Sequence, residues 1–186
     1  MPISTAEFRK GLKIEIDGKP YVIVESQHVK PGKGGAFVRT RIKNLETGQV
    51  LEQTFRSGAK VDKPDLEQRN MQFLYLEGSQ YVFMDNDTYD QVFIEGDYLG
   101  DSVNYMLPNI NVTVLFFNGR PIGVDLPITI NLTVTHTEPG VKGDTATGAT
   151  KGATMETGLV VQVPLFIDEG DVLKIDTRTG EYLERA

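Results

Sequence analysis

Cysteine and tryptophan are both absent from the 186-residue sequence. Without cysteine the chain has no disulfides, no thiolate metal ligands and no cysteine nucleophile. Long apolar runs are missing too, since no stretch approaches the roughly 18 apolar residues of a membrane span. The first residues also lack the basic and then apolar blocks of a signal peptide. We therefore expect a cytoplasmic protein with no membrane contact.

Histidine is almost absent, and this limits the catalytic chemistry. His28 and His136 are the only two, they lie far apart in the sequence, and neither has the spacing of a metal ligand. Carboxylates are dense between residues 85 and 101, a density more typical of a solvated acidic face than of an acid–base pair. We predict no enzyme activity, no catalytic residue, no metal and no cofactor. The alternative is a small β-barrel enzyme or ligand-binding module that uses this acidic segment.

The net charge of -7 hides an uneven distribution. Residues 1–63 carry 12 Lys or Arg against 7 Asp or Glu, residues 64–126 carry 2 against 10, and residues 127–186 carry 5 against 9. The net charges are therefore +5, -8 and -4, which sum to -7. A basic first third predicts an oriented contact with a polyanion. A chance imbalance of the surface is the alternative.

Strand patterns recur along the whole chain, and helical periodicity is nearly absent. Residues 37–43 alternate, with Val38, Thr40 and Ile42 on one face and a basic set, Arg39, Arg41 and Lys43, on the other. The other predicted strands cover residues 12–16, 21–24, 81–84, 111–117, 128–134, 159–163 and 172–175, and residues 96–106 form the one predicted short helix. Many short strands at close spacing predict an all-β fold of sandwiches or small barrels.

Two polar, proline-broken segments divide the chain. The first is residues 60–65, where the charge changes sign, and the second is residues 125–127. They predict three modules, residues 1–63, 64–126 and 127–186, each close to the lower size limit for independent stability. Residues 140–158 are rich in Gly, Thr and Ala and predict a long functional or mobile loop.

A loop between two predicted strands presents Lys33. Proline and glycine make the turn, and the glycines leave the lysine without bulky neighbours. The sequence is no nucleotide-binding Walker A loop, because glycine rather than Ser or Thr follows the lysine and a strand follows the loop. An ordinary hairpin loop with a solvated lysine remains the alternative. The tip-loop residues are Pro31, Gly32, Lys33, Gly34 and Gly35.

These segments together resemble the bacterial translation elongation factor P family over the whole chain. Residues 8–13 resemble its opening strand and residues 29–37 its tip loop. Gly143, Asp144 and Thr145 fall in a segment that looks like its third-domain Gly-Asp-Thr loop. Residues 163–167 and 176–182 are similar to its C-terminal signature. Each piece alone is weak, but five in the right order and spacing are specific.

The resemblance implies a fold and a function. The fold is an N-terminal SH3-like (KOW-type) barrel followed by two OB-fold barrels in an L-shaped, tRNA-like arrangement. The function is to bind the ribosome beside the peptidyl-tRNA and to promote peptide bond formation at consecutive prolines, with the Lys33 loop positioning the CCA end. A paralogue of the family with another role in translation is the alternative.

The resemblance also implies partners and contacts. The partners are the ribosome, the peptidyl-tRNA and the mRNA in the exit site, with the protein acting as a monomer. In many members the tip lysine is post-translationally extended, so Lys33 is the candidate for such a modification and for recognition by a lysine-modifying enzyme. The predicted RNA-binding residues are Lys30, Arg39, Arg41, Lys43, Gly143, Asp144, Thr145, Arg178, Tyr182 and Arg185.

Overall fold

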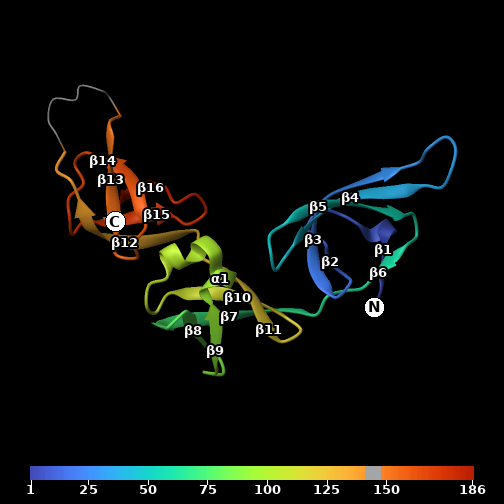
Figure 1. The fold of residues 1–186 in the computed structure, drawn as a ribbon, viewed down its shortest axis with the longest axis horizontal. Helices are drawn as coiled ribbons and strands as arrows, with labels where there is room; N and C mark the ends of the chain where they lie inside the picture. The colour runs from blue at the N-terminus through green and yellow to red at the C-terminus, as the bar shows by residue number, and fades with distance from the viewer. Residues whose placement is uncertain (141–147) are drawn as a thin grey trace. The chain divides into compact units, whose positions relative to one another are not determined.

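The computed structural model describes residues 1–140 and 148–186. Strands make up most of the regular secondary structure of the described chain, which confirms the all-β prediction (Figure 1). It forms two compact units: Met1–Arg69 with Val114–Gly123, and Asn70–Thr113 with Val124–Ala186. The predicted boundaries near residues 63 and 126, and the L-shaped arrangement, stay predictions.

The N-terminal module is a four-stranded sheet in the order β2-β3-β4-β5, next to a two-stranded pair, β1-β6. Its core holds Ile14, Ile23 and Ile42, and the rings of Phe8 and Phe55 meet edge to face at 5.3 Å. The elements are β1 (Ile3–Ser4), the 3-10 helix η1 (Thr5–Glu7), β2 (Lys13–Ile16), β3 (Lys19–Val29), β4 (Phe37–Asn44), β5 (Val50–Arg56) and β6 (Lys60–Val61).

β4 shows the alternation that the sequence predicts. Val38, Thr40 and Ile42 are buried, and the basic residues between them are exposed. β3 pairs with β4 as far as Val29 opposite Phe37, and its register shifts between Ile23 and Glu25 because Val24 is an extra residue. β3 and β4 therefore form a hairpin that is longer than the rest of the sheet. This hairpin extends from the module in Figure 1.

The middle of the chain forms a five-stranded sheet in the order β11-β10-β7-β8-β9. Asn118 and Gly119 join β10 to β11 with φ of 51° and 81°, the backbone of a tight hairpin turn. The elements are β7 (Leu66–Glu77), β8 (Gln80–Asp85), β9 (Gln91–Glu95), the single-turn helix α1 (Gly96–Leu99), the 3-10 helix η2 (Gly100–Tyr105), β10 (Asn111–Phe117) and β11 (Arg120–Asp125).

The C-terminal sheet has the order β14-β13-β12-β15-β16 and its own apolar core, which includes Leu132, Val163 and Leu173. Tyr105, from η2, is a buried member of the same core. Burial and the nearby Asp101 and Asp176 carboxylates raise the pKa of Tyr105 above its ordinary value. The elements are β12 (Thr129–Thr137), β13 (Thr150–Met155), β14 (Val160–Pro164), β15 (Val172–Asp176) and β16 (Tyr182–Arg185).

The sequence prediction was wrong or incomplete at several elements. The loop predicted for residues 140–158 is too long, since β13 occupies Thr150–Met155 and pairs with both β12 and β14. The helix predicted for residues 96–106 is one α-helical turn followed by a 3-10 helix. Seven further strands of the described chain were not predicted: β1, β5, β6, β7, β9, β11 and β16.

Candidate functional site

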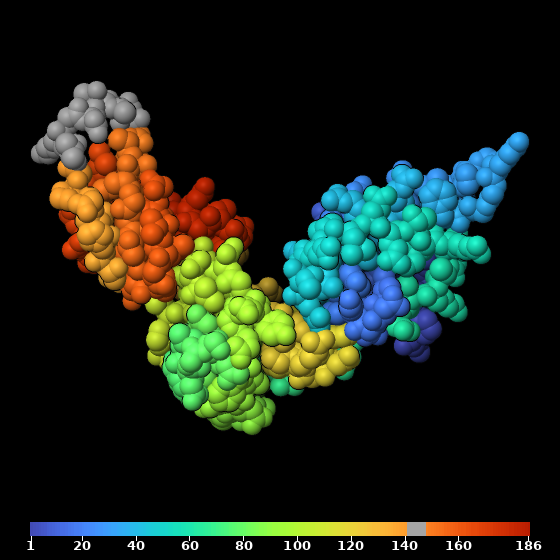
Figure 2. Space-filling view, in the orientation of Figure 1, coloured from blue at the N-terminus to red at the C-terminus, as the bar shows by residue number. Residues whose placement is uncertain are grey.

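The tip loop is the seven-residue connection 30–36 between β3 and β4. Lys33 is exposed at its centre, and no hydrogen bond or ion pair involves its side chain among the residues that the structure describes. Figure 2 shows the end of this hairpin as a narrow projection from the N-terminal module. The amine is therefore free to meet another molecule.

Only one of the tip glycines is required by the backbone. Gly34 has φ of 105°, in the region that favours glycine. Gly32 and Gly35 have no such φ, and a Cβ at either position would meet no atom within 4 Å. Neither the fold nor the packing demands glycine at these two positions. Their lack of side chains leaves room for close approach of a partner around Lys33.

The basic face of β4 is partly neutralised by the neighbouring strands. Arg39 Nε lies 3.5 Å from Glu52 Oε1 on β5, and Arg41 Nη1 lies 3.6 Å from Glu25 Oε2 on β3. All four side chains are half exposed or more, so each pair contributes at most about 1 kcal/mol and can exchange partners with little loss. Lys43 has no such pair within the described chain.

A hollow of about 460 Å³ lies at the base of the tip loop. Its lining includes Arg56, whose guanidinium has no ion-pair partner among the described residues. Lys30, on the other side of the loop, is exposed and likewise unpaired there. Two cations therefore flank the loop. The sequence predicted RNA binding for Lys30 but not for Arg56.

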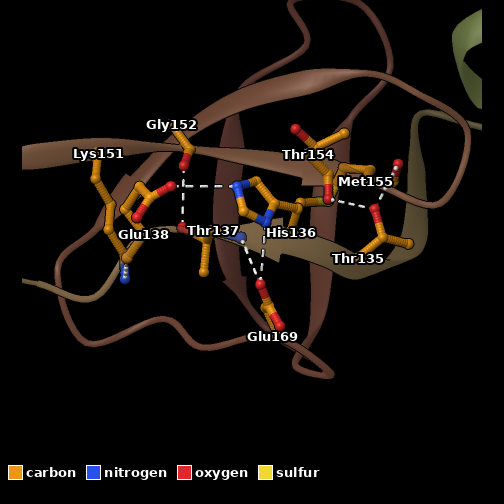
Figure 3. Close-up of polar contacts among 9 residues, drawn as sticks. All are labelled: Thr135, His136, Thr137, Glu138, Lys151, Gly152, Thr154, Met155 and Glu169. Carbon is orange, nitrogen blue, oxygen red and sulfur yellow. Dashed lines mark hydrogen bonds and ion pairs between the residues drawn. The ribbon is translucent and has the colours of Figure 1, made fainter.

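The predicted loop residues Gly143, Asp144 and Thr145 lie outside the described residues. Next to that segment, at the ends of β12 and β13, polar contacts are dense (Figure 3). His136 lies between two carboxylates, with Nε2 3.3 Å from Glu138 Oε1 and Nδ1 3.2 Å from Glu169 Oε1.

The same strand ends are also joined through a lysine and a threonine. Lys151 Nζ donates to the carbonyl of Glu138 at 2.6 Å, and Thr137 Oγ1 donates to the carbonyl of Gly152 at 3.0 Å. These contacts fix the two strand ends on either side of the segment.

The predicted C-terminal contacts are engaged within their own module. Arg178 donates to both carboxylate oxygens of Asp176, from Nη2 at 2.9 Å and from Nε at 3.2 Å, which lowers the pKa of Asp176. Arg185 lies over the Phe166 ring at 4.9 Å, and Tyr182 packs on the apolar core. Their roles in binding RNA stay predictions beside these structural ones.

Two further features concern the described residues only. No group of three or more His, Asp or Glu side chains there is arranged to hold a metal ion. No helix in that part of the chain is long and apolar enough to cross a membrane.

Three family models match successive parts of the chain. They are the elongation factor P KOW-like domain over residues 4–61, the elongation factor P OB domain over residues 66–124, and the elongation factor P C-terminal domain over residues 130–185. The KOW-like and OB matches agree with the predicted fold class.

Curated relatives match over nearly the full length. Elongation factor P of Moorella thermoacetica is 56% identical over 184 residues, which are 99% of this chain and 100% of the relative. Elongation factor P of Desulfitobacterium hafniense is 57% identical over 184 residues, with the same coverage.

Solved structures match in fold. Translation initiation factor 5A from Methanococcus jannaschii aligns with a TM-score of 0.56 at 24% identity, over 65% of this chain and 90% of that one. An initiation factor 5A family protein from Naegleria fowleri aligns with a TM-score of 0.55 at 19% identity, over 68% of this chain and 98% of that one.

Proposed function

Because the chain belongs to the elongation factor P family of translation factors, we propose that it binds the ribosome beside the peptidyl-tRNA and promotes peptide bond formation at consecutive prolines. In this proposal the Lys33 loop positions the CCA end of the peptidyl-tRNA. The observation that supports it most is Lys33 itself, exposed at the end of a long two-stranded hairpin and without an ion-pair partner among the residues that the structure describes.

The proposed mechanism is positioning rather than acid–base chemistry. Proline is a rigid, poor nucleophile, so a misplaced peptidyl-tRNA end wastes encounters. Holding that end in a reactive geometry supplies proximity and orientation, which can account for several kcal/mol of a barrier. The backbone hydrogen bonds between β3 and β4 hold the loop in place. Two of its glycines are not required by packing and leave space around Lys33.

RNA contacts follow the exposed cations of the N-terminal module. Arg39, Arg41 and Lys43 on β4, with Lys30 beside the tip, would contact phosphates and riboses. Arg39 and Arg41 would exchange their carboxylate partners for phosphates on binding. We also propose contacts from Gly143, Asp144 and Thr145 to the mRNA in the exit site, and from Arg178, Tyr182 and Arg185 to RNA.

The remaining parts of the proposal concern the setting. The protein acts as a cytoplasmic monomer, and Lys33 is the residue that a lysine-modifying enzyme would extend. No catalytic group, metal or cofactor is invoked, since ordering of the peptidyl-tRNA end needs none.

The test is a reconstituted translation assay with the full-length protein. Lys33→Ala should abolish acceleration on a message with three consecutive prolines, and Lys60→Ala, an exposed lysine on β6, should not. A message that lacks consecutive prolines serves as the control for general effects on translation. Full acceleration by Lys33→Ala would refute the role of Lys33, and an equal loss on both messages would indicate a different role in translation.

A further inference from the structure

The N-terminal module holds a second hollow, far from the tip loop. Its volume is about 440 Å³, and it lies between the turn that precedes β2 and the segment that follows β6. Apolar side chains, among them Leu12 and Leu66, form part of its wall. Four exposed cationic residues and no carboxylate line it in the described part of the chain: Arg9, Lys10, Lys13 and Lys63.

Both walls of this hollow are held by backbone hydrogen bonds. In the first wall, Gly11 N donates to Ile23 O at 2.8 Å, and Ile23 N donates to Leu12 O at 2.9 Å. Gly11 has φ of 89°, so the tight turn between Arg9 and Leu12 depends on glycine there.

The second wall is fixed in the same way on either side of Lys63. Glu15 N donates to Asp62 O at 2.9 Å, and Asn118 N donates to Asp65 O at 3.0 Å. The four cations therefore lie on two segments that backbone hydrogen bonds hold in place.

The charge of the hollow is uncompensated. None of its four cations takes part in an ion pair within the described chain, whereas Arg39 and Arg41 on β4 each have a carboxylate partner. The hollow therefore gathers four unpaired cations, whereas on the β4 face only Lys43 is unpaired within the described chain. Like charges gathered on one concave surface repel one another, and a bound anion relieves that repulsion.

We propose that this hollow binds a phosphodiester of an RNA backbone, as an anchor separate from Lys33. Lysine amines suit phosphate oxygens as point charges, and the Arg9 guanidinium suits them through paired donors. The apolar wall excludes water on one side and strengthens the attraction. The inference rests on the proposed function insofar as the RNA is that of the ribosome or of a bound tRNA.

The distance between the hollow and the tip loop explains how a phosphate bound in the hollow would act as an anchor. Lys13 pairs with Val22, and the tip loop begins after Val29 on the same strand. Seven residues of strand correspond to about 23 Å. One nucleotide cannot reach both places, so a phosphate in the hollow would restrain the module at one end while Lys33 acts at the other.

The test compares two double variants of equal charge. Lys10→Gln with Lys63→Gln removes a cation from each wall, and Lys19→Gln with Lys60→Gln removes two exposed cations that do not line the hollow. Ribosome binding is measured by co-sedimentation across a salt series. For the loss of one phosphate contact, the slope of log affinity against log salt should become shallower by about 0.7–0.9 for the first pair only.

A second readout does not depend on the ribosome or on proline. NMR of the full chain follows the Gly11 amide during titration with a 12-nucleotide single-stranded RNA and with a poly-glutamate peptide. The RNA should shift this amide, with half-saturation weakened at least about fivefold by the first pair and unchanged by the second, since only the first removes phosphate contacts.

The outcomes separate the two proposals. A shift by poly-glutamate but not by RNA would assign the hollow to an acidic protein and overturn the inference, as would no shift by either. If Lys33→Ala retained full activity while the RNA shift and its loss were observed, the proposed role of the tip would fail and the anchor would stand.

Discussion

Thr40 and Ser26 provide a sharp test of the packing in the N-terminal module. They lie directly opposite each other on β4 and β3, and neither hydroxyl has a hydrogen-bond partner among the described residues. Thr40 is 0% exposed. A buried hydroxyl without a partner costs about 1–3 kcal/mol relative to one that is satisfied. Thr40→Val replaces it with a methyl group of nearly the same shape.

We expect Thr40→Val to raise the free energy of unfolding of this module by about 1 kcal/mol. Thr5→Val is the matched control, because Thr5 is 1% exposed in the same module and its hydroxyl accepts from Gly58 N at 2.8 Å. That substitution leaves a backbone donor unpaired and should lower the free energy of unfolding by about 1 kcal/mol. The same chemical change thus has opposite signs at the two positions.

The assay is urea unfolding followed by the NMR signals of β4 amides, since the chain has no tryptophan to report on the module by fluorescence. The slope of free energy against urea should be the same for both variants. If Thr40→Val lowered the free energy of unfolding as much as Thr5→Val does, the Thr40 hydroxyl would have a partner and the reasoning would be refuted.

Three further predictions concern stability elsewhere. Gly180→Ala should lower it by about 1–3 kcal/mol in thermal or urea unfolding, because φ is 77° and the new Cβ would lie 3.1 Å from Tyr105 Oη. The ion pair with Arg178 lowers the pKa of Asp176, so the stability that this pair contributes is fully present above the pKa of a free aspartate, about 4, and is lost as the pH falls through the lowered pKa of the folded protein. The stability difference between wild type and Asp176→Asn should therefore shrink in a pH titration toward 2. Lys33→Ala should leave the melting temperature nearly unchanged, with an effect within about 0.5 kcal/mol, since its side chain is exposed and makes no hydrogen bond or ion pair with the described residues; a large shift would mean that the loop is structural.

Local patterns in the sequence predicted the elements that position the tip. Alternation along residues 37–43 placed Arg39 and Arg41 outward correctly, because a strand with one buried face has period two. The glycines and proline between two strand patterns predicted the loop that presents Lys33. Neither inference needed information from distant parts of the chain.

Contacts between strands could not be predicted in the same way. The ion pair between Arg41 and Glu25 depends on the register of β3, and that register is shifted by one residue at Val24. Nothing in the local sequence marks that shift. The 3-10 residue Tyr105 likewise joins a core built mainly from strands that follow it by 24 residues or more, and no periodicity reports such a contact.

The cationic hollow could not be predicted from the sequence either. Its walls are residues 9–13 and residues 63–66, at least 50 positions apart in the chain. Arg9 and Lys10 fall in the segment that resembles an opening strand, and Lys63 falls in a polar segment that divides the chain. The pairing of β1 with β6 and the bridge between Glu15 and Asp62 bring these two segments together.

The length of the β3–β4 hairpin sets how the reach of Lys33 can vary. Lengthening both strands by one residue would carry the loop about 3.3 Å outward, but it would also turn every side chain beyond the insertion to the opposite face. An insertion on the sheet side of Arg39 keeps this residue outward only if each strand gains two residues, so such insertions change the reach in steps of about 7 Å. A distance between Lys33 and its target that is smaller than one step can be covered by a longer side chain at the tip, but not by a longer hairpin.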